Sequence, residues 1–232
     1  MAHRPAIAYF DLDRTLIATN SAKGWVKRQV RRGNVSRRQA ARAALSMGLY
    51  HLGVADMDRL IREAVRELRG AEEADLEARS LAYWHEEVIR TIRPGARTAL
   101  ARHRARGDQL VVLTASSPYL GEAARAALDM HGVLSNRFEV VDGRFTGAAI
   151  EPLCFGAGKA TLAAAHAAEH GVELADCAFY TDSFTDLPAL EAFGEPVVVH
   201  PDPRLLRAAR RRGWRVERWD SADDPGRHGG RG

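Results

Sequence analysis

The sequence predicts an α/β fold in which a doubly wound, Rossmann-like parallel sheet core carries an inserted all-helical domain. From residue 94 onward, helical and strand-like segments alternate with short connections, as in a parallel sheet covered by helices. The stretch of about 75 residues between the first strand and this alternation is helical in periodicity and too long for an ordinary connection. The 232 residues are enough for one core domain with a smaller insertion.

The first predicted strand is the apolar run "AIAYFDL" at residues 6–12. The inserted block then shows helical periodicity, with glycine-containing turns between its segments. Apolar residues of its third segment fall on one helical face, as in a helix bundle, and Pro94 and Gly95 end the block. Four helices are therefore expected, at residues 21–33, 36–53, 55–70 and 71–92.

The second part of the chain contains the alternating elements of the core. Asp142 and Gly143 form a turn signal between two strand-like runs, which predicts a β-hairpin over residues 138–150. The tail from 220 to 232 has no large apolar residue and is expected to be disordered. Helices are expected at 96–107, 119–132, 158–171, 185–194 and 203–213, and strands at 109–116, 177–183, 196–201 and 214–219.

Composition limits the function classes only broadly. The net charge of +4 favours anionic ligands but does not single out nucleic acid, so no nucleic-acid partner is expected. The two cysteines, Cys154 and Cys177, are too few and too isolated for a disulfide framework or a zinc site. The start lacks the features of a signal peptide and no apolar run has the length of a membrane span, so a soluble cytoplasmic protein is expected.

Polar, reactive side chains follow several predicted strands at the point where each strand ends. Because the carboxyl ends of parallel strands meet at one edge of the sheet, these side chains should lie together. Lys159 begins a helix that precedes one of these strands. The side chains are Asp11, Asp13 and Thr15 after the first strand, Thr114 after the second, and Asp182, Ser183 and Asp186 after a later one.

Three carboxylates converging in a low dielectric repel one another unless a cation lies among them. Mg²⁺ fits, because proteins hold it with one or two carboxylates together with substrate phosphate oxygens. With a lysine and hydroxyl donors added, the site suits a phosphoryl group. One carboxylate can then attack phosphorus and form an aspartyl-phosphate. The second aspartate, two residues on and on the same side of an extended chain, can act as general acid and base.

Four sequence motifs carry a resemblance to a known family. The segments "FDLDRTL" (10–16), "VVLTAS" (111–116), "GKATL" (158–162) and "YTDSFTDLP" (180–188) resemble, in this order, the four motifs of the haloacid dehalogenase (HAD) superfamily of phosphatases. The helical insertion after the first motif and the "DGRFTG" hairpin between the second and third are similar to the phosphoserine-phosphatase-like branch.

The resemblance implies a role for each residue. Asp11 would be the nucleophile, and Asp13 the general acid and base, with its backbone carbonyl also facing the metal. Asp11, Asp13 and Asp182 would thus form the Mg²⁺ site. The remaining implied roles are phosphoryl binding by Thr114, Ala115 and Lys159, orientation of Lys159 or of the metal waters by Asp186, support of the first loop by Thr15, and a place in the outer coordination sphere of the metal for Ser183.

The same resemblance divides the chain into a core domain with the catalytic site (1–16 and 94–219) and a helical cap (17–93) that closes over the site and selects the substrate. Phosphoserine phosphatases carry a glutamate early in the cap that binds the substrate's amino group, whereas Asn20 stands near that position here. The fourth motif and residues 200–214 look like a group that includes histidinol-phosphate phosphatases. The expected substrate is a small phosphorylated metabolite such as histidinol phosphate or a phosphoserine-like compound.

Alternatives remain open at this point. A phosphotransferase would use the same intermediate. Residues 21–53 carry eight Lys or Arg and no Asp or Glu, so a non-catalytic module could bind nucleic acid or an anionic lipid, and the run could also make weak peripheral contact with an acidic membrane. A P-loop at Lys159 is excluded by Leu153 and Ala160, where that motif needs Gly and Ser or Thr. The sequence leaves the oligomeric state unknown.

Overall fold

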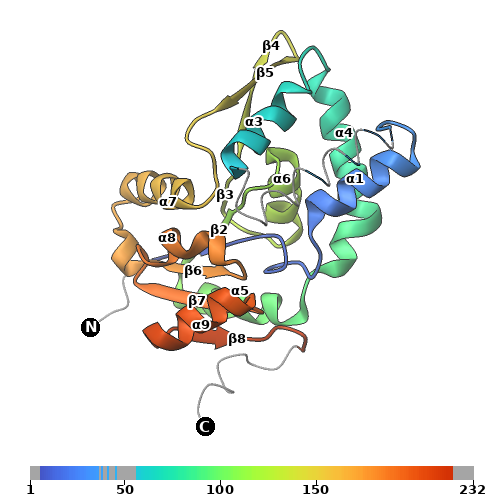
Figure 1. Cartoon of the computed structure of the whole chain (residues 1–232). Coiled ribbons are helices and arrows are strands. Elements are labelled where there is room, and N and C mark those ends of the chain that lie inside the picture. Colours follow the sequence, from blue (N-terminus) through green and yellow to red (C-terminus); the bar gives the residue numbers. More distant parts are fainter. Residues whose placement is uncertain (1–5, 37, 39–40, 42–44, 46–55, 222–232) are drawn as a thin grey trace.

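The core is a six-stranded sheet in which every neighbouring pair is parallel, in the order β3-β2-β1-β6-β7-β8 (Figure 1). The computed structural model describes residues 6–36, 38, 41, 45 and 56–221. The chain builds outward from β1 in one direction and then returns to build outward in the other, so the predicted doubly wound α/β fold is confirmed. The strands are β1 Ile7–Phe10, β2 Gln109–Leu113, β3 Gly132–Leu134, β6 Ala178–Thr181, β7 Glu195–Val199 and β8 Arg215–Glu217.

Helices cover both faces of the sheet, which explains why its strands are apolar on both sides. In β1, Phe10 packs toward one face, with α5 and α6, whereas Tyr9 packs toward the other, with α7, α8 and α9. These two clusters form the hydrophobic core. The covering helices are α5 Pro94–Arg106, α6 Pro118–Ala127, α7 Ala157–Glu169, α8 Leu187–Leu190 and α9 Pro203–Arg212, with short 3-10 helices at Leu174–Asp176 and Phe184–Asp186.

The insertion between β1 and α5 contains α1 Ser21–Arg31, α3 Met57–Arg66 and α4 Glu73–Tyr83. Asn20 and Asp56 cap α1 and α3 by accepting hydrogen bonds from first-turn backbone amides. A π-helical turn at Trp84–Val88 and a 3-10 turn at Ile89–Thr91 follow α4 and lead back to the core. The helix predicted over 36–53 falls almost entirely outside the described residues.

The predicted β-hairpin is present as β4 Arg137–Val141 and β5 Arg144–Ile150, paired antiparallel. Asp142 and Gly143 both have positive φ, as the tightest hairpin turns require. The hairpin packs against the inserted helices: the Gly70 amide donates to the Phe145 carbonyl at 2.8 Å, and the Glu73 amide donates to the Gly143 carbonyl at 2.9 Å. Figure 1 shows the hairpin beside α3, at the end of the molecule away from the sheet.

Two predicted helices were wrong in extent. The helix predicted over 119–132 ends at Ala127, because Asp129 takes a left-handed conformation, and Gly132 begins the edge strand β3 instead. The helix predicted over 185–194 is reduced to a 3-10 turn and the four-residue α8. The tail expected to be disordered lies almost entirely outside the described residues, since only Asp220 and Ser221 are described, and Asp220 pairs with Arg93 at 3.0 Å. Among the described residues, no helix combines the length and apolar character needed to cross a bilayer.

Candidate active site

The loop after β1 places Asp11 at the carboxyl edge of the sheet, beside β6. The Asp11 amide donates to the Tyr180 carbonyl at 2.9 Å, which continues the β1–β6 pairing past the end of the strand. The chain then turns back at once, with the Leu16 amide donating to the Asp11 carbonyl at 3.3 Å and Arg14 in a left-handed conformation. This tight turn keeps Asp11 buried at the point where the direction of strand addition reverses.

Lys159, from the first turn of α7, joins two of the predicted acids. Its Nζ donates to Asp11 Oδ1 and to Asp186 Oδ2, each at 2.7 Å, and all three side chains are buried. Thr181 Oγ1 also donates to Asp186 Oδ2 at 2.6 Å. Burial opposes the charged ammonium, but the two carboxylates outweigh it and raise the pKa of Lys159. Asp186 therefore contacts Lys159, one of the two roles that the sequence left open for it.

Asp182 follows β6 and brings a further carboxylate to the same edge. Burial, reinforced by the charge of Asp11, raises the pKa of Asp182 to about 8. Burial also raises the pKa of Asp11, although the Lys159 charge opposes that shift. In the part of the chain that the structure describes, no hydrogen bond or ion pair engages the Asp182 carboxylate. Two nearby buried carboxylates that repel each other make a site with a deficit of positive charge.

A bound cation would neutralise these carboxylates, so the side chains at this point were compared with the ligands that a metal ion needs. Among the described residues, no three His, Cys, Asp or Glu side chains group as a preformed metal cluster, so side chains could supply two ligands, Asp11 and Asp182. Two carboxylates with further oxygens from backbone, substrate and water suit Mg²⁺ and not a closed structural site. The Asp13 carboxylate is engaged by the insertion: its Oδ1 accepts a hydrogen bond from the Ser21 amide at 2.9 Å.

The loop after β2 presents Thr114 and Ala115. Thr114 Oγ1 accepts a hydrogen bond from the Ser116 amide at 3.1 Å, so its hydroxyl proton stays available for a ligand. Asn136 fixes this loop by donating from Nδ2 to the Ala115 carbonyl at 2.7 Å, while its Oδ1 accepts from the Cys154 amide at 2.8 Å. The sequence reasoning missed Asn136, because the strand β3 that precedes it had not been recognised.

Two supporting residues lie in less central positions. Thr15 is buried in the turn after β1, and its Oγ1 has no hydrogen-bond partner among the described residues. Ser183 caps the 3-10 turn at Phe184–Asp186, with its Oγ accepting from the Thr185 amide at 3.3 Å. The structure therefore shows a capping contact for Ser183, and Thr15 packs inside the loop that it was expected to support.

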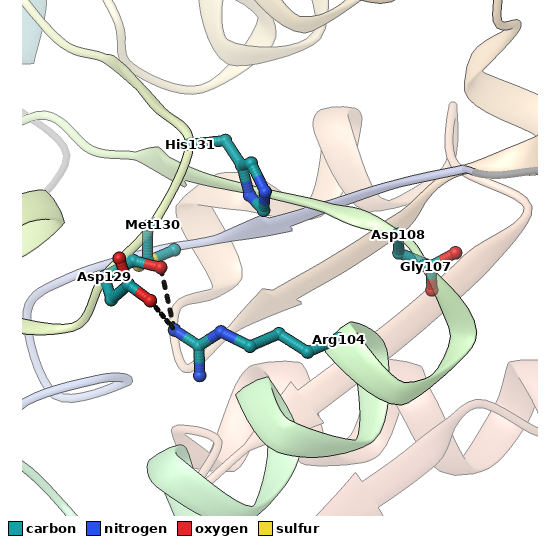
Figure 2. Close-up of a pocket in the computed structure, with 6 residues that line it drawn as sticks. All are labelled: Arg104, Gly107, Asp108, Asp129, Met130 and His131. Atoms are coloured by element: carbon teal, nitrogen blue, oxygen red, sulfur yellow. Dashed lines mark hydrogen bonds and ion pairs between the residues drawn. The ribbon is translucent and has the colours of Figure 1, made fainter.

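A separate pocket of about 270 Å³ lies at the amino-terminal end of the strands, where α5 ends and β2 begins. Figure 2 shows the Arg104 guanidinium directed at the turn around Asp129, whose carbonyl accepts its hydrogen bond at 2.8 Å. None of the predicted site residues lines this pocket, so it is distinct from the carboxylate site. Its lining residues are Arg104, Gly107, Asp108, Asp129, Met130 and His131.

Comparisons with known proteins agree with this geometry. The family model for haloacid dehalogenase-like hydrolases matches residues 8–191. A protein of Mycobacterium tuberculosis named probable phosphatase is 34% identical over 213 residues, covering 90% of this chain and 74% of the relative. A protein of Neisseria meningitidis named histidinol-phosphatase is 29% identical over 215 residues, covering 90% of this chain and 97% of the relative.

Solved structures share the fold. A protein of unknown function from Bordetella pertussis superimposes with a TM-score of 0.83 at 27% identity, covering 91% of this chain and 97% of the other. A phosphoserine phosphatase, solved as a phospho-aspartyl intermediate analogue, gives a TM-score of 0.67 at 16% identity, with 94% of each chain covered. The core with its helical insertion is therefore the architecture of the phosphoserine phosphatases, as the sequence predicted.

Proposed function

We propose, from the premise that this chain belongs to the haloacid dehalogenase-like hydrolase family, that it is a Mg²⁺-dependent phosphatase acting through an aspartyl-phosphate on Asp11. The observation that carries the proposal is the pair of 2.7 Å contacts from Lys159 Nζ to Asp11 and Asp186. Lys159 holds Asp11 Oδ1 and thereby orients the carboxylate, whose other oxygen is the proposed nucleophile. The names of the relatives, probable phosphatase and histidinol-phosphatase, support the same reaction class.

In the first proposed step, an Asp11 carboxylate oxygen forms a bond to phosphorus as the bond between phosphorus and the leaving oxygen breaks. Asp13, protonated at this stage, gives its proton to the leaving oxygen. Burial raises the pKa of Asp13, which favours the protonated acid, although the Ser21 hydrogen bond opposes this shift. Lys159 and the Thr114 hydroxyl donate hydrogen bonds to the phosphoryl oxygens.

In the second step, water attacks phosphorus and the bond from Asp11 to phosphorus breaks, releasing inorganic phosphate. Asp13, now a carboxylate, takes the proton from the attacking water and returns to its starting form. Asp11, Asp182 and the Asp13 carbonyl would hold Mg²⁺. When bound, the ion neutralises negative charge on the phosphoryl group.

The proposed substrate is a small phosphorylated metabolite, with histidinol phosphate the first candidate because of the relative of that name. Asn20 accepts a hydrogen bond from the Lys23 amide at 2.9 Å as the cap of α1, and it offers no carboxylate to a substrate ammonium group. In the proposed division of labour, residues 1–16 and 94–219 form the catalytic core and residues 17–93 form the cap. The hairpin, although encoded within the core segment, packs on the cap and would move with it.

The experiment compares wild type with Asp11→Asn in p-nitrophenyl phosphate hydrolysis with and without Mg²⁺. Asp11→Asn should lose turnover, because an amide does not attack phosphorus, and wild type should depend on Mg²⁺. Asp142→Asn, in the hairpin turn, is the matched control and should stay active. Comparable activity of Asp11→Asn and wild type would reject the assignment. A panel of phosphorylated metabolites, with and without added alcohols, then identifies the substrate and separates hydrolysis from phosphoryl transfer.

A further inference from the structure

The carboxylate of Asp13 is held by the first residue of the inserted helices. The Ser21 amide donates to Asp13 Oδ1 at 2.9 Å, and Ser21 is buried at the start of α1. The Ser21 side chain also hydrogen-bonds to the Asp13 carboxyl group, so the backbone and the side chain of this one residue both hold the acid. The orientation of Asp13 therefore depends on where the insertion holds Ser21.

Ser21 is in turn held by Tyr83, which lies 62 residues further along the chain at the end of α4. The Tyr83 hydroxyl donates to the Ser21 carbonyl at 3.1 Å, and the side chain is buried. Burial, with the charges of Glu87 and Asp13, raises the pKa of Tyr83 to about 12, so the hydroxyl stays protonated as a donor. The three residues form one connected chain from α4 to the acid.

The packing around Tyr83 is specific to this contact. A Cβ atom built on Gly24 would lie 1.9 Å from the Tyr83 hydroxyl oxygen, so only glycine at this position of α1 lets the hydroxyl reach Ser21. Trp25 packs edge-on against the Tyr83 ring, with 5.7 Å between ring centroids. The helix α1 thus accommodates the Tyr83 side chain over its whole first turn.

A second set of contacts fixes α1 to the segment that carries Tyr83. Directly after Tyr83 the helix widens into the π-helical turn Trp84–Val88, a feature that often occurs at functional sites. This turn directs Glu86 and Glu87 to one guanidinium: Arg28 Nη1 lies 2.7 Å from a carboxylate oxygen of each, and Arg28 is buried. The position of Tyr83 relative to α1 is therefore fixed at both ends of the helix.

We propose that Tyr83 is a positioning residue for Asp13, acting through Ser21 to aim the acid at the leaving oxygen. The proposal rests on the proposed phosphatase reaction. Loss of the Tyr83 hydroxyl removes the hydrogen bond to the Ser21 carbonyl, so Ser21 can shift and its amide no longer holds Asp13 in one orientation. The contact between the nucleophile Asp11 and Lys159 does not involve Tyr83 and should stay unchanged. Loss of the Tyr83 hydroxyl should therefore slow the hydrolysis of those substrates whose leaving oxygen must be protonated as it departs.

The kinetic test compares Tyr83→Phe with Tyr119→Phe, a matched control. The Tyr119 hydroxyl donates to Glu73 at 3.0 Å between α6 and α4, and it contacts neither Ser21 nor Asp13. The measured quantity is kcat/KM, which includes no step after the leaving group departs, for p-nitrophenyl phosphate and for glycerol 2-phosphate. Nitrophenolate is a good leaving group without protonation, whereas an alkoxide is a poor one.

Tyr83→Phe should lower kcat/KM for glycerol 2-phosphate about tenfold more than for p-nitrophenyl phosphate, a part of what a general acid supplies. Tyr119→Phe should leave the ratio of the two values unchanged. Gly24→Ala should act like Tyr83→Phe, because its methyl group displaces the hydroxyl. An equal fall for both substrates in Tyr83→Phe means a structural role only, and overturns the proposal.

A second measurement needs no catalysis: amide hydrogen exchange at Ser21 in protein without Mg²⁺ or substrate. Exchange should be slow in wild type and in Tyr119→Phe, and faster in Tyr83→Phe. Unchanged exchange at Ser21 in Tyr83→Phe overturns the inference whatever the activity. If wild type hydrolyses neither phosphate, the proposed function fails, and Ser21 exchange alone then decides whether Tyr83 holds this contact.

Discussion

Asp182→Asn should stabilise the metal-free protein and should abolish its stabilisation by Mg²⁺. The carboxyl of Asp182 is buried beside Asp11, and its pKa is raised from 3.8 to about 8. Below pH 3.8 the group is protonated in both the folded and unfolded chains and does not change the free energy of unfolding. As the pH rises, the unfolded chain ionises first, so the folded protein loses stability continuously up to about pH 8.

The size of the effect follows from the same pKa difference. Each pH unit between 3.8 and the working pH contributes about 1.4 kcal/mol, so at pH 7 the carboxyl lowers the free energy of unfolding by about 4 kcal/mol. An asparagine amide has the shape of the protonated acid and does not ionise. Asp182→Asn should therefore be more stable than wild type at pH 7 by an amount of that order, with the difference vanishing near pH 4.

The assay is urea denaturation of both proteins in EDTA at several pH values from 4 to 8, repeated with Mg²⁺. Mg²⁺ should stabilise wild type, since the ion supplies the missing opposite charge, and should have little effect on Asp182→Asn. Asp129→Asn, at a fully exposed side chain, is the control and should match wild type throughout. The reasoning is refuted if Asp182→Asn is no more stable than wild type at pH 8 in EDTA.

Three further predictions concern neighbouring groups. Lys159→Met leaves the Asp186 carboxylate buried without its cation, so chemical denaturation should show a loss of roughly 3–5 kcal/mol together with loss of turnover. Asn136→Ala removes the 2.7 Å bond to the Ala115 carbonyl and should cost about 1–3 kcal/mol in the same assay and raise KM, whereas an unchanged KM would separate Asn136 from the site. His103 is buried and its pKa is lowered to about 4, chiefly by burial, so the unfolded chain binds its proton first and denaturation should show stability falling as the pH drops from 6.5 toward 4. His103→Gln should flatten that dependence.

Local sequence patterns were sufficient to predict most of the secondary structure. The β1 run is apolar on both faces, which predicts a central strand, and Asp142 with Gly143 predicts the hairpin turn, because only a few residues adopt its left-handed backbone. The predicted site residues Asp11 and Asp182 do follow neighbouring strands, since parallel strands bring their carboxyl ends to one edge. The short edge strand β3 was missed because three residues carry too little periodicity.

Only the tertiary structure decided which of these groups touch. Lys159 reaches Asp11 across 148 residues of sequence, and Tyr83 reaches Ser21 across 62, so no local pattern encodes either contact. The 3-10 turn at Phe184–Asp186 brings the Asp186 carboxylate to Lys159, a contact that the sequence alone did not decide. The sequence by itself determined which reactive side chains are present. It also determined that they lie at the carboxyl edge of the sheet, because short-range periodicity shows where each strand ends. Their pairing and pKa values depend on burial and on side-chain packing between distant segments, which exist only in the folded chain.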